Sequence, residues 1–544
     1  MKNIFANPQK SALVVLLILI SALTIRLYNL NKYDLWFDEA STIRFFHENI
    51  ERRTSLSGLP AATIIFEQAQ KDPHPFFYYL LIYACSFLLK GWWSLRLLSV
   101  VFSVLSLFIF YKFARLIYDH STSLLAVLLM AISPFQVWYA QEMRVYAVSE
   151  FFALLAVLFF VKILKNGGKK YWVYFLIAEI FAILTSYYSF FLLLAAFGFL
   201  LFKHKFANLK RIILFITAVF ALCSPFLAFF LIQVNSIKDY FWLRPPVIKN
   251  IFLSFAAFGL GYSANYQQLI IGSTAIFALF ARGVYRSIKE KNEYAFFLLG
   301  SFFLPLLLVY LVSKFGLHIY IDRQFIVITP FYYLFIAYGI TSLRNVKLKL
   351  LVCVALIVFM ACLLGNYYSG FMLSSGGRRD FYPGVHERKQ SRSLLDYLYS
   401  NFENGDLAAA TDIQSYSLAG ETVWKFGSHK SYWLLFYPAT IHSVERYAFG
   451  GEFSGFLRQI KAEGNESFLH AVHYSNSRRL VVEKEPFADK AFKRIWLITS
   501  SWDKVGLSPV NYNHEKIKGL LSNDYKCVEF MKKDGVLLEI FEKK

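Results

Sequence analysis

Residues 11–27 read SALVVLLILISALTIRL, and residues 33–40 follow closely as YDLWFDEA. The first stretch is apolar and long enough to cross a bilayer. The second places two adjacent carboxylates, Asp38 and Glu39, directly after that predicted span. Two adjacent acids at a membrane surface are most often solvated loop charges, unless other polar residues gather with them. The stretch therefore predicts a membrane protein with a candidate acidic site where the first span ends.

The composition excludes a soluble globular chain. Of 544 residues, 57% are hydrophobic and only 17% are charged, which is typical of a protein with many membrane spans. The formal charge of +21 comes from 57 Lys and Arg against 36 Asp and Glu. Most basic residues of the first two-thirds lie in short loops between apolar runs, as expected on the cytoplasmic side and near anionic lipid. We therefore expect membrane lipid, and no nucleic acid, among the partners.

The basic loops also predict the topology. With a cytoplasmic N-terminus and an uncleaved first span, hydropathy and loop charge give about eleven crossings and a C-terminus outside. Residues 76–89 must begin and end on the outer face and are too short to cross, so we expect an interfacial helix there. The loops expected to be cytoplasmic are residues 162–170, 203–211, 282–291 and 344–349.

The predicted fold class is thus a multi-spanning α-helical membrane protein with a C-terminal extracytoplasmic α/β domain. The membrane domain is expected over residues 1–375, with a first outer loop at 29–95 that carries interfacial helices, and the soluble domain over 376–544. Within the soluble domain the pattern predicts a helix, two strands and a hairpin. These elements are expected at residues 388–402, 406–411, 494–499, and 527–531 with 536–541.

The same topology collects polar residues on the outer face. Charges at membrane depth are costly, so their collection at one level indicates a polar cleft with mutual pairing. The alternative for each basic residue is that its side chain extends from the end of a span toward water. For Arg96 both interpretations stay open. The outer-face residues are Asp38, Glu39, Asp72, His74, Arg96, Gln141, Glu142, Arg144 and Glu150.

Six short stretches carry a resemblance to a known family. They are Asp38-Glu39, Asp72-Pro73-His74-Pro75, Arg96-Leu97-Leu98-Ser99, the segment Ser133–Tyr146, Tyr146-Ala147-Val148-Ser149-Glu150, and the segment Asp322–Pro330. In this order they resemble the polytopic GT-C-type glycosyltransferases that use polyprenyl-phosphate sugars, a superfamily that includes protein O-mannosyltransferases and aminoarabinose transferases of lipid A. Gln324 stands where the family usually has Tyr in its Arg-Tyr-(x)-Pro segment.

The resemblance implies a role for each matched residue. Asp38 would be the general base and acceptor contact, supported by Glu39. His74, Arg96, Arg144 and Arg323 would hold the phosphate of the lipid donor. The supporting or acceptor-side residues would be Asp72, Gln141, Glu142, Tyr146 and Glu150. No cofactor is certain, and a divalent metal stays open, with Asp38, Glu142 and Glu150 as its candidate ligands.

We therefore expect an enzyme of the plasma (inner) membrane that transfers a hexosyl or pentosyl group from a polyprenyl-phosphate donor to an extracytoplasmic protein, lipid or glycan. The sequence has no Gly-rich phosphate loop and no predicted cytoplasmic domain, which disfavours a nucleotide-sugar donor. Two alternatives stay open. Another outer-face lipid-phosphate transferase would need metal-binding His and Asp clusters in the soluble domain, and the sequence shows none. Paired inverted repeats or interrupted spans would indicate a lipid transporter or flippase, and only residues 251–281 look interrupted.

Overall fold

A computed structural model describes the protein over most of its helical part and over the strands of its C-terminal part. The described residues are 8–33, 35–36, 38–39, 42, 74–86, 88–89, 92–204, 209–240, 243, 245–371, 385, 392–403, 406–410, 433–436, 470–474, 480–484, 493–500, 514, 518–519, 521–522, 524–533 and 536–544.

The chain divides into two compact units. Residues 1–30 and 65–385 form the first unit, and residues 31–64 and 386–544 form the second. The residues predicted as one outer loop, 29–95, are thus shared between the two units. The predicted domain boundary between residues 375 and 376 stays a prediction.

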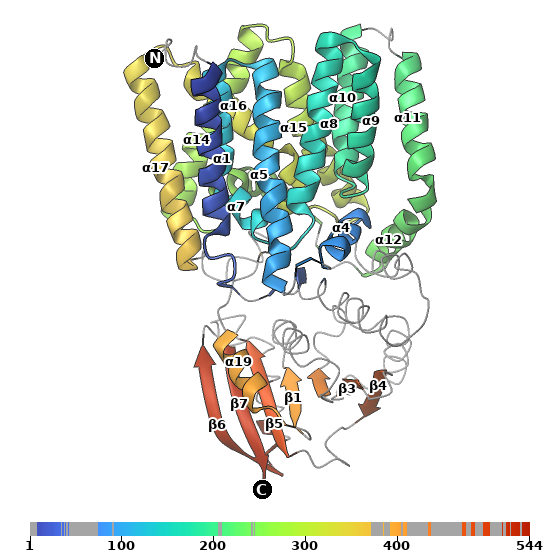
Figure 1. Cartoon of the computed structure of the whole chain (residues 1–544), viewed down its shortest axis with the longest axis vertical. Coiled ribbons are helices and arrows are strands. Elements are labelled where there is room, and N and C mark those ends of the chain that lie inside the picture. The colour runs from blue at the N-terminus through green and yellow to red at the C-terminus, as the bar shows by residue number, and fades with distance from the viewer. Residues whose placement is uncertain are drawn as a thin grey trace. The chain divides into compact units, whose positions relative to one another are not determined.

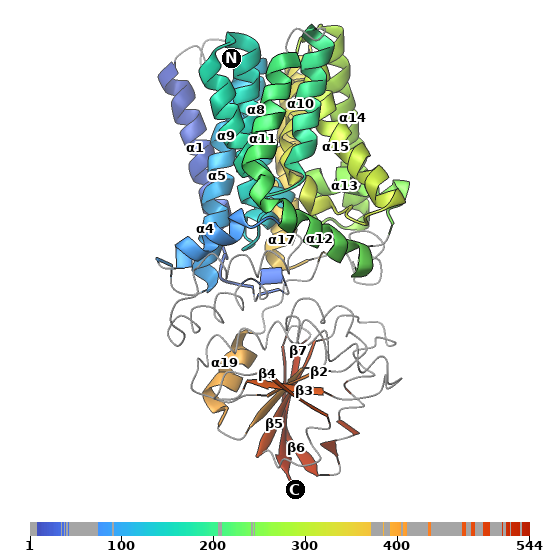
Figure 2. The same ribbon diagram turned by 90° about the vertical axis from the view of Figure 1, so that its right-hand side faces the viewer.

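The first unit is built of helices. Figures 1 and 2 show most of them side by side along a common direction, with the short helices α4 and α12 at one end of the bundle. The helices are α1 (Pro8–Leu27), α4 (Phe77–Ser86), α5 (Trp92–Ile117), α6 (His120–Ile132), α7 (Pro134–Ala140), α8 (Tyr146–Asn166), α9 (Lys169–Ile183), α10 (Ser189–His204), α11 (Leu209–Cys223), η1 (Ser224–Phe226), α12 (Leu227–Tyr240), α13 (Ile248–Leu260), α14 (Tyr266–Lys289), α15 (Ala295–Phe315), η2 (Asp322–Ile328), α16 (Thr329–Thr341) and α17 (Val346–Ser369).

The multi-spanning helical class is confirmed. Among the described residues, seven helices are long and apolar enough to cross a membrane, or eight if a bent pair counts as one span. Shorter apolar helices occur at Ser11–Leu27, Ser189–Lys203 and Ile248–Leu260, so the count of eleven stays a prediction. The 10-residue helix α4 is roughly 15 Å long, half of what a crossing needs. It is the short helix expected within residues 76–89.

Prolines lie at two breaks between consecutive helices. Pro134 opens α7 directly after α6, and the two helices meet at a 59° bend. Pro is favoured at the first position of a helix, because the N–H that it lacks would have no partner there. Pro225 lies in the 3₁₀ turn η1 between α11 and α12.

The second unit contains a seven-stranded sheet, as expected of an α/β domain. Its strand order is β4-β3-β2-β1-β5-β7-β6, with β1 parallel to β2 and to β5 and the other pairs antiparallel. The predicted hairpin is confirmed as β6 and β7. The elements are α19 (Arg392–Asn401), β1 (Leu407–Ala410), β2 (Trp433–Phe436), β3 (His470–Tyr474), β4 (Leu480–Lys484), β5 (Arg494–Ser500), β6 (Tyr525–Lys533) and β7 (Val536–Lys543).

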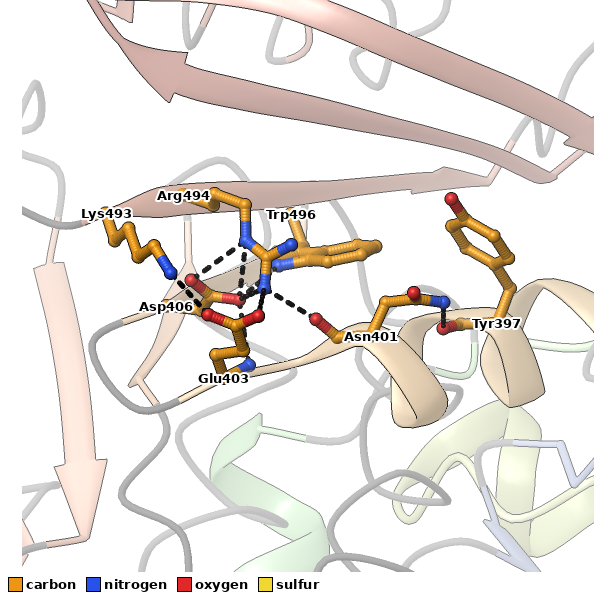
Figure 3. A network of polar contacts seen from close by, with 7 residues as sticks. All are labelled: Tyr397, Asn401, Glu403, Asp406, Lys493, Arg494 and Trp496. Carbon is orange, nitrogen blue, oxygen red and sulfur yellow. Dashed lines mark hydrogen bonds and ion pairs between the residues drawn. The ribbon is translucent and has the colours of Figure 1, made fainter.

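A polar network joins α19 to the starts of β1 and β5 (Figure 3). The buried Asp406 carboxylate accepts from Arg494 Nη2 at 2.8 Å and from Trp496 Nε1 at 2.9 Å. Arg494 Nη2 also donates to the carbonyl oxygen of Asn401, at the end of α19, over 2.6 Å. A buried carboxylate needs such partners. The network therefore holds the helix against the sheet and accounts for Asp406 without a catalytic role.

Candidate functional site

Three separate segments of the first unit bring a histidine, a tyrosine and an arginine together. His74 lies just before α4, Tyr146 opens α8, and Arg323 lies in η2. The Arg323 guanidinium carbon is 5.9 Å from the centre of the Tyr146 ring, over its face. The His74 ring meets the same tyrosine edge-on, with centroids 6.2 Å apart. Tyr146 is thus the shared wall between the two basic side chains.

Gln324 extends this group, which we call the His74–Arg323 cluster: His74, Tyr146, Arg323 and Gln324. The amide nitrogen of Gln324 lies 3.4 Å from Nε2 and 3.5 Å from Nδ1 of His74. His74, Tyr146 and Arg323 are buried, and Gln324 is half-buried. The sequence marked Gln324 only as a departure from the family pattern, whereas the structure places its side chain against the imidazole.

A hydrogen-bond chain fixes the segment that carries Arg323. The Asp322 carboxylate accepts from the backbone N–H of Arg323 at 2.8 Å and from the Tyr262 hydroxyl at 2.9 Å. The hydroxyls of Tyr262 and Tyr139 are 2.6 Å apart. Asp322 therefore ties η2 to the turn after α13 and to α7. Nothing in the sequence pairs Tyr262 with Asp322, because the two belong to different elements.

Glu150 lies in a second hydrogen-bond network. Its Oε1 accepts from Gln136 Nε2 at 2.7 Å, and the same amide nitrogen donates to Thr329 Oγ1 at 2.7 Å. Thr329 follows η2 directly, so this network joins α7 and α8 to the end of the Arg323 segment. The Glu150 side chain is fully buried. Glu150 thus has protein contacts of its own, and its acceptor-side role stays a prediction.

Arg26 is a buried cation that the sequence analysis did not single out. Its Nε donates to Ser103 Oγ at 2.8 Å, and its Nη1 donates to the Ala131 carbonyl at 2.8 Å. The guanidinium thereby links α1, α5 and the end of α6. A charged residue inside an apolar run is itself the signal that could have found it.

The other predicted residues of the first unit lie near the ends of helices. Gln141 uses both ends of its amide, donating to the carbonyls of Arg26 and Tyr28 and accepting from the Tyr367 hydroxyl at 2.5 Å. The Glu142 carboxylate accepts from Trp138 Nε1 at 2.5 Å. Arg96 Nη1 donates to the Leu30 carbonyl at 2.9 Å. Arg144 is buried in the turn between α7 and α8.

The predicted acidic pair belongs to the second compact unit. Asp38 and Glu39 lie in a helical turn, where the Thr42 hydroxyl donates to the Asp38 carbonyl at 3.0 Å. Asp38 is half-buried and Glu39 is buried. Asp72 lies outside the described residues. The catalytic roles of this pair therefore stay predictions.

The described part of the chain contains no evident set of metal ligands. No group of three His, Cys, Asp or Glu side chains there could hold an ion. Of the candidate ligands, Glu142 bonds to Trp138 and Glu150 bonds to Gln136, so each carboxylate already has a protein donor.

The chemistry of the His74–Arg323 cluster suits an anion. A guanidinium presents several N–H groups in a fixed fork that matches phosphate oxygens, and an imidazole can donate a further hydrogen bond. A buried aromatic wall keeps water away and strengthens such contacts.

A family model and two groups of solved structures resemble the chain. Residues 71–229 match the model of the family described as dolichyl-phosphate-mannose-protein mannosyltransferase. ArnT from Cupriavidus metallidurans, solved bound to undecaprenyl phosphate, has 10% sequence identity and a TM-score of 0.56, with 97% of each chain covered. Its apo state gives a TM-score of 0.57 at 11% identity, again with 97% of each chain covered.

The archaeal oligosaccharyltransferase AglB from Archaeoglobus fulgidus is a further structural relative. Solved in complex with an inhibitory peptide and a dolichol-phosphate, it has a TM-score of 0.50 and 11% identity, covering 97% of this chain and 80% of that one. No curated protein matches the chain. At these identities the structures establish a common fold.

Proposed function

We propose that this chain is a GT-C-type glycosyltransferase that transfers a sugar from a polyprenyl-phosphate-linked donor to an extracytoplasmic acceptor, a proposal supported by the family match over residues 71–229 and by the shared fold. The donor would be a hexosyl or pentosyl lipid phosphate, and the acceptor a protein, lipid or glycan. The membrane would be the plasma (inner) membrane, with the N-terminus cytoplasmic and the C-terminal domain outside.

The observation that carries the proposal is the His74–Arg323 cluster. Two basic side chains from distant parts of the sequence meet at one buried tyrosine. A buried guanidinium and a buried imidazole present hydrogen-bond donors that suit an anionic ligand. The phosphate of a polyprenyl donor is such a ligand, and ArnT was solved with undecaprenyl phosphate bound. Arg96 and Arg144 are further candidates for the same phosphate.

The proposed reaction is a single displacement at the anomeric carbon of the sugar. An acceptor hydroxyl oxygen attacks that carbon, and the bond from the carbon to the phosphate oxygen breaks. Asp38 takes the hydroxyl proton, supported by Glu39. Arg323 and His74 stabilise the negative charge that stays on the departing polyprenyl phosphate. Asp72 and Glu142 remain candidates for contact with the acceptor.

Binding of the product lipid tests the proposal directly. The full chain in nanodiscs should bind undecaprenyl phosphate, and Arg323→Ala should weaken binding far more than Arg323→Lys, which keeps the charge but loses the fork. A matched control is Arg344→Ala, in the exposed turn before α17. Equal affinities for the parent chain and Arg323→Ala would remove Arg323 from the phosphate site.

The sugar and the acceptor require a second experiment. Mass spectrometry of the cell envelope from a deletion strain should show loss of one sugar substituent, restored by the parent gene. An unchanged envelope glycan and glycoprotein profile would argue against transfer and would favour a transporter.

A further inference from the structure

His74 is held by a glutamine that no predicted site includes. Gln233 lies on α12, and its Nε2 donates to the backbone carbonyl of His74 at 3.0 Å. The hydroxyl of Tyr187, in the turn between α9 and α10, donates to Gln233 Oε1 at 2.6 Å. Gln233 is only 2% exposed, so both ends of a buried amide are bonded to protein groups.

Two neighbouring contacts grip the same stretch of backbone. The N–H of Phe77 donates to the Leu184 carbonyl, at the end of α9, over 3.2 Å. The Phe76 ring stacks on Phe226 of η1 with centroids 4.3 Å apart and an interplanar angle of 23°. Residues 74–77 are therefore held from one side by the turn after α9 and from the other by the break between α11 and α12.

The backbone and the side chain of His74 have different partners. Gln233 bonds to the main chain of His74, while the imidazole extends to Gln324 and Tyr146. Fixing the carbonyl fixes the point from which the ring projects. A side-chain amide at this depth is costly unless both of its ends are bonded, and here both bonds serve the His74 segment.

We infer that Gln233 is a positioning residue, which holds His74 in place to meet the phosphate of a polyprenyl-phosphate ligand. The inference rests on the proposed function. Because the Gln233 amide donates to the His74 carbonyl, its influence on the ligand would pass through His74. Tyr187 is the next residue outward, because it fixes the rotation of the Gln233 amide.

The experiment is a double-mutant cycle on the binding of undecaprenyl phosphate by the full chain in nanodiscs. Gln233→Met removes both hydrogen bonds with little change of volume and should weaken binding roughly 10- to 100-fold, as expected for a misplaced binding group. Tyr187→Phe, which leaves the Gln233 amide in place, should weaken binding less. Gln267→Met, at an exposed position of α14, is the matched control and should bind as the parent does.

The decisive comparison uses His74→Asn as background. If Gln233 acts through His74, adding Gln233→Met to His74→Asn should change affinity by less than about twofold, because coupled residues do not contribute independently. A merely structural loss would instead multiply with that of His74→Asn, and this result would overturn the inference, as would parental binding by Gln233→Met.

A folding failure of Gln233→Met and a failure of the parent chain to bind lead to different conclusions. Should Gln233→Met fail to fold, Tyr187→Phe carries the same comparison with His74→Asn, and independent losses there would equally overturn the inference. If the parent chain does not bind undecaprenyl phosphate at all, the proposed function fails first, and the role of Gln233 fails with it.

Discussion

Arg323 is held through both its side chain and its backbone. Its guanidinium lies over the Tyr146 ring, an arrangement favoured by the negative face of the aromatic ring. Its backbone N–H is fixed by Asp322, and the next residue, Gln324, faces His74. The replacement of the usual family Tyr by Gln at position 324 therefore supplies a polar contact to the imidazole. The site is therefore defined by contacts between residues that are far apart in the sequence, and a single motif does not specify it.

Asp38→Asn tests the proposed base. Asn keeps the shape of the side chain but cannot accept the proton, so sugar transfer should fall roughly 10²- to 10⁴-fold. Binding of undecaprenyl phosphate should stay close to that of the parent chain. The control is Asp396→Asn, at an exposed position of α19. Transfer at the parental rate by Asp38→Asn would direct attention to Glu39 or Glu142.

Glu539 makes the second unit sensitive to acid. Burial would raise the pKa of this carboxyl, but hydrogen bonds from His514 and from Lys518 at 3.1 Å hold the pKa below its ordinary value of 4.5. A lowered folded-state pKa contributes stability above the unfolded-state value, which is lost as pH falls through the folded-state pKa. The protection factors of the β7 amides, which correct for the slowing of intrinsic exchange as pH falls, should therefore decrease below about pH 4.5. Glu539→Gln should remove this component of the pH dependence, and an unchanged profile would contradict the assignment.

At the scale of elements, the close packing of α14 against α16 constrains the position of the site. Helices α14 and α16 approach through Gly283 and Gly339, where an added Cβ would lie 1.9 Å from the Phe335 carbonyl oxygen and 2.0 Å from the Leu279 carbonyl oxygen. Small residues permit such approach between membrane helices. Because α16 continues directly from η2, the spacing of this helix pair also constrains the segment that carries Arg323.

Gly283→Ala should separate α14 from α16. The new methyl group meets a backbone oxygen that cannot rotate away, so the free energy of unfolding should fall by about 3 kcal/mol. Gly300→Ala is the matched control, since no atom lies within 4 Å of its Cβ position in α15, and it should be neutral or stabilising by up to about 1 kcal/mol. Thermal unfolding in detergent measures both. Equal melting temperatures would mean that the helix pair can adjust.

The membrane topology belongs to the scale of the whole molecule. In the described part of the chain, seven helices meet the length and apolarity of a span, the bent pair α6–α7 supplies an eighth, and shorter apolar helices accompany them. The predicted odd number of crossings requires the two ends of the chain to lie on opposite sides of the membrane. A cytoplasmic N-terminus then requires an external C-terminal sheet.

Cys527 offers a test of that orientation. It is a free, exposed cysteine on β6, so a membrane-impermeant maleimide should label it in right-side-out vesicles. The Cys527→Ala variant gives the background from Cys85, Cys223, Cys353 and Cys362, which lie in helices. Labelling of Cys527 only after the vesicles are opened would place the sheet domain on the cytoplasmic face and would reverse the predicted topology.

The sequence alone determined the class of protein, the short helix after His74 and the β6–β7 hairpin, because apolar length and local periodicity are properties of contiguous residues. It also marked His74, Tyr146 and Arg323 through local motifs. Only the tertiary structure decided that these three residues meet, that Glu150 bonds to Gln136 and Thr329, and that Gln233 holds His74. Such contacts join residues far apart in the chain, and their geometry is set by how helices pack, which the spacing of residues along one helix does not specify.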